Sequence, residues 1–361
     1  GNSSLSVTEQ ANLGQDAVID FIDQGSQVGL DGFDGTLANT LTGSGLLSLN
    51  QGANVVLSDN NVADSVDINI ATDSNLDLVN LSDFNHSLSG QGNLTVNNGG
   101  TFAFGQQVGS SFGGVFSLNN TTFDLADSNN TKALASGTLN VSTGSEVKVG
   151  SEDRTLNNLT LSGGALDFSM TSPQQKADGI INTDGTLQLD KGKVNVTGSS
   201  SWENVLPAVS PSLSLLDQDK GEVVMTLINA SQVSGNTDNL ALTINGQSIS
   251  QSDSTLTSNI LQNGQLAAIG TYSYGLTDTK SAAESGLYLK YSLNGLNLIT
   301  DGDNALLLKT VVGENQTFNT LLSGSGGLVV DGSAGSLTLA NGNNSYTGTT
   351  TVAEGGLTLG A

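Results

Sequence analysis

The chain has 361 residues, and its 10 Lys and Arg against 34 Asp and Glu give a formal net charge of −24 at pH 7. Such a surface repels nucleic-acid phosphates and anionic lipid, so nucleic acid is not an expected partner. The chain contains no cysteine, which excludes disulfides, thiol catalysis and cysteine metal sites.

A short strand motif of the form Gly-x-Leu-x-Leu recurs along the chain, and a second alternating strand follows most of the early copies after seven or eight residues. Alternation of apolar and polar residues is the period of a β-strand with one buried face. The intervals between copies correspond to one or two units of about 20–28 residues, the range of coiled solenoids. The copies occupy 45–49, 92–96, 137–141, 157–161, 185–189, 326–330, 335–339 and 355–359.

These intervals predict an all-β fold, a right-handed parallel β-helix (solenoid) with loop or hairpin excursions. A stack of antiparallel hairpins is the alternative, but it leaves the strand spacing irregular. In the β-helix each turn packs on its neighbours, and inward Leu, Val, Ile and Phe form one long core. Outward Asn, Asp, Thr and Ser then stack in rows along the rod.

Two roles are open for the asparagines of these rows. Exposed rows offer hydrogen bonds through which two rods can associate side by side. Corners of the coil, in contrast, need left-handed backbone angles, which asparagine tolerates. The candidates for a self-association surface are Asn97, Asn98, Asn119, Asn120, Asn129 and Asn130.

From about residue 199 to 285 the repeat fades, which divides the chain into three parts. Residues 1–198 and 286–361 are predicted as β-helix rungs, and 199–285 as rungs interrupted by long loops or a hairpin subdomain. Within this part, "LALTINGQSI" at 240–249 has an Asn-Gly turn between two alternating runs, a strong hairpin signal.

Four of the five tyrosines lie close together, at 272, 274, 288 and 291. Excursions from a solenoid often build its binding surface. Tyr272 and Tyr274 are therefore candidates for stacking on sugar rings, in a groove beside the 199–285 loops. The alternative is that these tyrosines cap a local core.

The closing run "NGNNSYTGTTTVAEGGLTLG" resembles the autotransporter-associated β-strand repeat over residues 341–359. Ser345 stands where threonine is commoner in that repeat. Residues 272–298 resemble a segment of AIDA-type passengers. The positions that match the repeat are Asn344, Tyr346, Gly348, Thr350, Val352, Gly356, Leu357 and Leu359.

This resemblance implies an autotransporter passenger of the AIDA-type adhesin family, exported by type V secretion. It implies a place at the bacterial cell surface, tethered to the outer membrane in the full-length protein by a C-terminal outer-membrane β-barrel that these 361 residues do not include. The expected function is autoaggregation and biofilm formation, with the same protein on neighbouring cells as partner. Host glycans or extracellular-matrix proteins are the alternative partners. We expect 341–361 to be one rung of a longer passenger.

No enzymatic activity is predicted, although a polysaccharide lyase or hydrolase on a β-helix is the remaining alternative. Such enzymes need a base with calcium, or two carboxylates at a defined separation. The only histidine, His86, lies in a predicted corner, and one histidine makes neither a triad nor a zinc site. The only arginine, Arg154, lies beside Glu152 and Asp153, where a surface ion pair is expected.

No cofactor or metal site is expected either. The acidic runs 59–67 and 301–304 offer oxygen ligands for Ca²⁺, but neither follows a known calcium-loop pattern. Asx-turns at strand ends explain both runs more simply.

Overall fold

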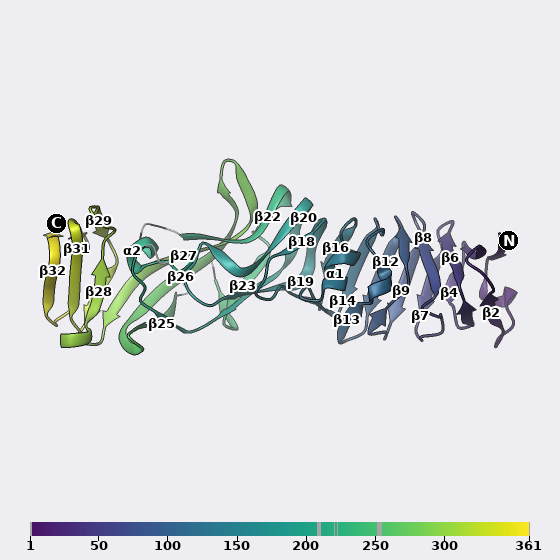
Figure 1. Cartoon of the computed structure of the whole chain (residues 1–361), viewed down its shortest axis with the longest axis horizontal. Coiled ribbons are helices and arrows are strands. Elements are labelled where there is room, and N and C mark those ends of the chain that lie inside the picture. Colours follow the sequence, from purple (N-terminus) through teal and green to yellow (C-terminus); the bar gives the residue numbers. More distant parts are fainter. Residues whose placement is uncertain (1, 208–210, 220, 222, 251–254, 361) are drawn as a thin grey trace.

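The structure, a computed structural model, describes residues 2–207, 211–219, 221, 223–250 and 255–360. The chain winds into an elongated rod, and its termini lie at opposite ends of the rod (Figure 1). The regular secondary structure is nearly all β, with 60% of residues in strands and 5% in helices, and it forms a parallel β-solenoid of about 16 turns. The predicted fold class, a parallel β-helix with hairpin excursions, is confirmed.

The N-terminal part of the rod consists of short strands that pair in parallel with strands one turn away. Helix α1 (Ser128–Ala133) and the 3₁₀ helices η1 (Gln10–Asn12) and η2 (Gln106–Val108) interrupt the coil. The strands are β1 (Ser3–Val7), β2 (Val18–Phe21), β3 (Ser26–Asp31), β4 (Asp34–Thr36), β5 (Thr40–Gly43), β6 (Gly45–Asn50), β7 (Asn54–Leu57), β8 (Val66–Ile70), β9 (Asn75–Val79), β10 (Asp83–Phe84), β11 (Leu88–Gly90), β12 (Asn93–Asn97), β13 (Thr101–Phe104), β14 (Val115–Asn119), β15 (Thr122–Asp124), β16 (Thr138–Ser142), β17 (Glu146–Lys148) and β18 (Arg154–Leu156).

The strand register explains the sequence repeat. Five inward side chains form one column, and each is at most 1% exposed. Because equivalent positions of successive turns stack, the apolar surface of each turn is buried against the next, which stabilises the coil. The spacing in this column is 18, 22, 23 and 20 residues, near the predicted unit. The column contains Leu76, Leu94, Phe116, Leu139 and Leu159.

The second strand of each predicted pair stacks in the same way. Phe102 of β13 aligns with Phe123 of β15, and Phe123 aligns with Val147 of β17. The offset of seven or eight residues in the sequence therefore marks the turn from one face of the coil to the next.

One predicted equivalence is wrong. The motif at 45–49 lies in β6, on a different face of the coil from the motif at 92–96 in β12. Leu47 aligns with Val28 and Ile68 instead of joining the column of Leu94. Strands on every face bury alternate residues, so the motif alone does not reveal the face that it occupies.

Beyond β18 the strands become long, and antiparallel pairing interrupts the parallel coil. β22 pairs with β27, β25 with β26, and β26 with β27, all antiparallel. The hairpin between β26 and β27 projects from the side of the rod (Figure 1). The elements here are β19 (Asn158–Met170), β20 (Lys176–Gly198), β21 (Ser201–Glu203), α2 (Leu215–Gln218), β22 (Val223–Gly235), β23 (Leu240–Ile244), β24 (Gln247–Ile249), β25 (Thr255–Gln262), β26 (Gln265–Ser281) and β27 (Glu284–Leu298).

The predicted hairpin at 240–249 is confirmed. β23 and β24 pair antiparallel, and the two turn residues Asn245 and Gly246 have φ angles of 50° and 78°. Both angles are those of a type I′ turn, which asparagine and glycine favour. The domain boundaries at 198 and 285 stay predictions.

Parallel rungs resume at the C-terminal end. The run that resembles the autotransporter repeat forms a rung, because β32 pairs in parallel with β31. Asn344 Oδ1 accepts a hydrogen bond from the Leu322 amide at 2.9 Å, which ties this rung to the one before it. None of the helices in the described ranges has the length and apolar character needed to cross a membrane. The elements are η3 (Gly302–Asn304), β28 (Leu306–Lys309), β29 (Asn315–Phe318), β30 (Leu321–Gly324), β31 (Leu328–Leu339) and β32 (Thr350–Leu359).

Candidate functional site

The six asparagines predicted as a self-association surface differ in exposure. Asn97 and Asn120 are exposed, whereas Asn98, Asn119 and Asn129 are half-buried. Asn120 has a φ of 49°, a left-handed corner. The side chain of Asn98 donates to two carbonyl oxygens and accepts from an amide in its own turn. Asn120 therefore has the corner role that the sequence left open, and the side chain of Asn98 is used by hydrogen bonds within the fold.

The prediction for Asn130 is wrong, because its side chain is 0% exposed. Its Oδ1 accepts a hydrogen bond from the Phe104 amide at 2.8 Å, and its Nδ2 donates to the Asp124 carbonyl at 2.8 Å. Both polar groups of this amide are satisfied inside the fold. Asn130 thus fixes α1 to β13 and β15, and its buried side chain is not accessible to a partner.

The sugar-stacking role of Tyr272 and Tyr274 is also contradicted. Tyr272 is 0% exposed and Tyr274 8%, and burial raises the pKa of both phenols. Tyr272 Oη donates to Gln218 Oε1 at 2.5 Å, and its ring contacts those of Trp202 and Tyr274. The tyrosines form a local core, which was the alternative in the sequence.

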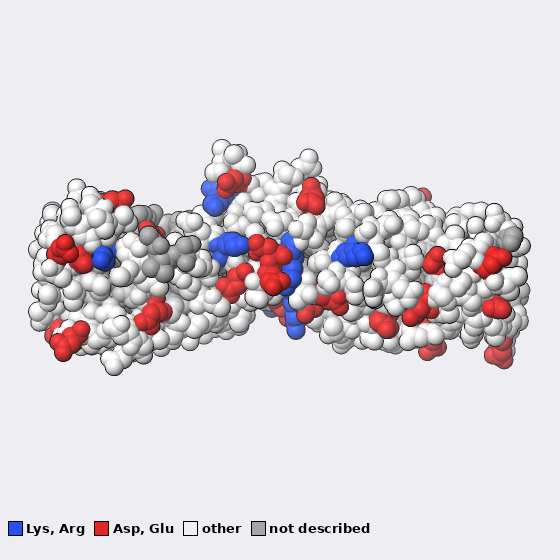
Figure 2. Space-filling view, in the orientation of Figure 1, with Lys and Arg blue, Asp and Glu red and all other residues white. Residues whose placement is uncertain are grey.

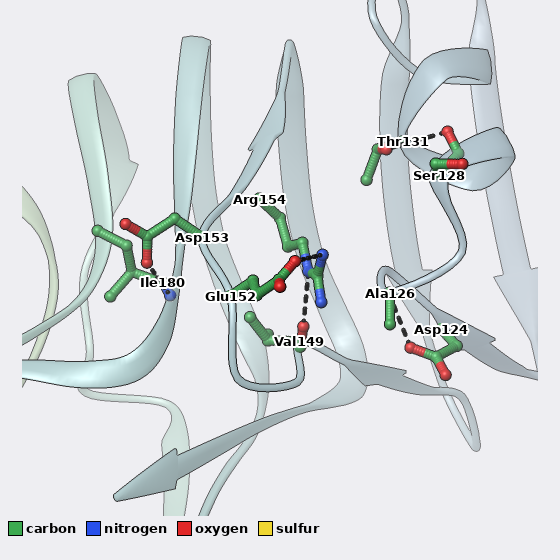
Figure 3. A network of polar contacts seen from close by, with 9 residues as sticks. All are labelled: Asp124, Ala126, Ser128, Thr131, Val149, Glu152, Asp153, Arg154 and Ile180. Atoms are coloured by element: carbon green, nitrogen blue, oxygen red, sulfur yellow. Dashed lines mark hydrogen bonds and ion pairs between the residues drawn. The ribbon is translucent and has the colours of Figure 1, made fainter.

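The only arginine and the only histidine hold the fold together. Arg154 Nη1 lies 3.4 Å from Glu152 Oε2, and Arg154 Nε donates to the Val149 carbonyl at 3.0 Å (Figure 3). The predicted surface ion pair is confirmed. His86 is 7% exposed, its Nδ1 lies 3.0 Å from the Val66 carbonyl oxygen, and burial lowers its pKa.

The acidic run 301–304 forms a turn at a helix start. Asp301 Oδ1 accepts hydrogen bonds from the amides of Gly302 at 2.9 Å and Thr349 at 3.1 Å. Across the part of the chain that the structure describes, no group of three or more His, Asp or Glu could hold a metal ion.

A polar groove of about 480 Å³ lies on the outer face of β17, β19, β20 and β23. Outward side chains of successive turns stack in register because side chains alternate along each strand. Two alanines in one row leave space between longer side chains, and Ser169 and Thr197 line the groove on its other side. In stacking order the middle row is Lys148, Asp167, Asn195 and Thr243, and the row with the alanines is Glu146, Ala165, Lys193 and Ala241.

Hydrogen bonds run along the middle row of the groove. Thr243 Oγ1 donates to Asn195 Oδ1 at 2.6 Å, and Asn195 Nδ2 donates to Asp167 Oδ1 at 2.8 Å. Burial, together with the hydrogen bond and charge of Glu146, raises the pKa of Asp167 to about 7. Asp167 is therefore about half protonated at pH 7.

This pKa predicts how stability depends on pH. Above pH 4 the unfolded chain releases the proton that folded Asp167 keeps until about pH 7, so stability falls as the pH rises through this range. We expect Asp167→Asn to reduce the loss of Tm between pH 5 and pH 8. Asp190→Asn, an exposed carboxylate of β20, is the matched control. Equal slopes in the wild type and Asp167→Asn contradict the assignment.

Charge is distributed unevenly along the rod. Residues 1–131 contain 14 Asp and Glu and no Lys or Arg, whereas residues 132–200 contain 7 acidic and 6 basic residues. Residues 201–361 contain 13 acidic and 4 basic residues. Figure 2 shows basic side chains gathered near the middle of the rod and only acidic ones at its N-terminal end. The groove lies in this nearly neutral middle section.

The sequence prediction missed the groove, although part of its signal is visible there. The alternating strands around Val147, Leu166 and Val194 place their neighbours on the outside, including Asp167 and Lys193. These outward residues come from four turns. Which of them touch depends on the strand register, and the sequence does not specify that register.

The fold and the groove define a β-solenoid rod with a polar, charged side face. No protein-family model and no solved structure matches the chain. The chain is similar to the uncharacterized protein YuaQ of Escherichia coli (strain K12), at 30% identity over 357 residues, which cover 91% of this chain and 26% of YuaQ. It is also 30% identical over 278 residues to the uncharacterized lipoprotein YdeK of the same organism, with 71% of this chain and 20% of YdeK covered. The chain therefore spans about a quarter or less of these relatives.

Proposed function

We propose that this chain is a rod segment of a bacterial surface adhesin, an autotransporter passenger of the AIDA type that holds cells together by side-by-side association of β-solenoids. In the full-length protein the rod is tethered to the outer membrane. Its elongated shape and its lateral polar rows support this role, as does a lipoprotein among its relatives. A host glycan or matrix protein is the alternative partner, but not at Tyr272 and Tyr274, which are buried.

The distribution of charge is the observation that carries the proposal. Two rods of charge −24 repel each other, and this repulsion is strongest where the cation-free section 1–131 faces another acidic section. Sections 132–200 of two rods meet with almost no net repulsion. The proposed contact therefore lies there, with exposed Lys191 available for acidic groups of the second rod.

A binding role without catalysis or cofactor is part of this proposal. Glu146 lies beside Asp167 on the neighbouring turn and helps to raise the pKa of its carboxyl group. Hydrolases that cleave glycosidic bonds hold their two carboxyl groups about 5–9.5 Å apart, so that a sugar or a water fits between them. The direct interaction of Glu146 with Asp167 favours a binding role instead.

Sedimentation equilibrium of the purified chain tests self-association. We expect the association to strengthen when salt is raised from 0.01 M to 0.15 M, because the Debye length shrinks from about 30 Å to about 8 Å and screens the net repulsion. Lys191→Glu is expected to weaken the association about tenfold, because both rods carry the substitution and each then places a negative charge in the contact. Lys280→Glu, the same charge change on the projecting hairpin, is the control. A monomer in every condition, or equal effects of both variants, contradicts the proposal.

A further inference from the structure

The groove between Glu146 and Thr243 has features that self-association does not explain. Its volume of about 480 Å³ falls within the range of about 300–1,000 Å³ typical of ligand sites. It combines a carboxyl pair, an amide, hydroxyl groups and two lysines, whereas the polar rows elsewhere consist mainly of Asn, Ser and Thr. The row Asn54, Asn75 and Asn93, for example, consists of amides alone, which two hydrogen bonds link.

We infer that this groove binds a saccharide unit with neighbouring hydroxyl groups and a single carboxylate, such as a uronic acid within a longer glycan. The hydroxyl groups bind along the middle row, and the carboxylate binds the lysines at the edge. This site goes beyond the proposed self-association and does not depend on it.

The hydrogen-bonding capacity of the middle row suits hydroxyl groups. Asn195 uses its Oδ1 and one N–H inside the row, which leaves the second N–H as a donor toward the groove. The carboxyl oxygens of Glu146 are acceptors beside it. A sugar hydroxyl both donates and accepts, so it can bridge an amide N–H and a carboxylate oxygen, which a simple anion or cation cannot do.

The lysines provide the charge for one carboxylate. Lys148 and Lys193 are exposed at the two sides of Asp167, and neither belongs to the ion pairs found in the described ranges. While Asp167 is protonated, the two lysines outnumber the remaining carboxylate, and the groove carries a small net positive charge. A polyanion is disfavoured because the rest of the rod is strongly acidic, so one acidic unit among neutral sugars fits best.

Protonation of the carboxyl pair must then control binding. The charged groups that face Asp167 are Glu146 and Lys148 on β17 and Lys193 on β20, while β23 contributes the uncharged Thr243. When Asp167 loses its proton above about pH 7, its negative charge repels the sugar carboxylate.

The test is calorimetric titration of the purified chain with a trisaccharide that carries one glucuronate, and with the same trisaccharide as its methyl ester. We expect the free acid to bind and the ester to bind at least about tenfold more weakly. Affinity for the acid is expected to fall between pH 6 and pH 8.5, and Asp167→Asn to remove this dependence while binding persists.

Two kinds of variant locate the site. Thr197→Trp fills the groove from an exposed strand position and is expected to abolish binding, whereas Thr317→Trp, at an exposed position of β29, leaves it intact. Lys193→Gln is expected to weaken binding about five- to tenfold, and Lys280→Gln to leave it unchanged. Circular dichroism checks that each variant is folded. Equal affinity for acid and ester, binding retained in Thr197→Trp, or no binding of either sugar overturns the inference.

Discussion

Replacing Phe116 by alanine is expected to lower the unfolding free energy by about 3–5 kcal/mol, among the largest effects of any single substitution in this chain. Phe116 is fully buried. The centroid of its ring lies 4.7 Å from that of Phe104, 5.4 Å from that of Phe123 and 5.7 Å from that of Phe102. Removing the ring leaves a cavity between two turns and breaks several edge-on and tilted ring contacts.

The loss is expected to be local, because each turn of a solenoid contacts only its neighbours. Hydrogen exchange measures this directly. In Phe116→Ala, amides of β12, β14 and β16 should exchange faster, while those of β31 keep their protection. Phe116→Leu, which retains most of the volume, is the matched control with a cost of about 1.5 kcal/mol or less. Faster exchange along the whole rod contradicts the account of independent turns.

Asp219→Ala is expected to have the second large effect, about 2–4 kcal/mol. Asp219 is 8% exposed and accepts hydrogen bonds at 2.7 Å from the amides of Asn319 and Thr320, and at 2.5 Å from Thr320 Oγ1. It thereby connects the segment after α2 to the turn between β29 and β30, about 100 residues away. Alanine leaves the buried Thr320 amide and the Asn319 amide without this acceptor.

Denaturant unfolding and the exchange rate of the Thr320 amide test this prediction. The amide is expected to lose its protection in Asp219→Ala. Asp303→Ala, which removes an exposed carboxylate nearby in the sequence, should change the unfolding free energy by about 0.5 kcal/mol or less. If the two variants have similar stability, Asp219 does not join these segments.

The fold could be predicted from the sequence because its physical cause is local and repeated. Alternation at Leu94 and Val96, and again at Leu139 and Val141, follows from one buried face in each strand, and the near-constant spacing follows from the length of a turn. The hairpin at Asn245 and Gly246 could also be predicted from the sequence, because its turn needs left-handed backbone angles that asparagine and glycine adopt most readily.

The candidate site could not be predicted in the same way, because exposure and neighbourhood depend on long-range packing. Asn130 and Asn97 look alike in the sequence, yet Asn130 is buried by the contact of α1 with β13. The spacing of Tyr272 and Tyr274 in the sequence is also compatible with outward side chains. In the structure, the antiparallel pairing of β25, β26 and β27 buries both tyrosines, and Tyr272 packs against Trp202. Predicting the groove would have required the strand register of four successive turns, which the sequence does not specify.

Homotypic adhesion is tested most directly by the settling of cells that display this chain, mixed with differently labelled cells that do not, in the presence and absence of EDTA. We predict clumps that contain displaying cells alone, with EDTA having no effect, because the proposed contact uses lysines and acidic groups rather than a metal ion. Displaying cells that stay in suspension, or clumps that include both kinds of cell equally, contradict self-association of the rods.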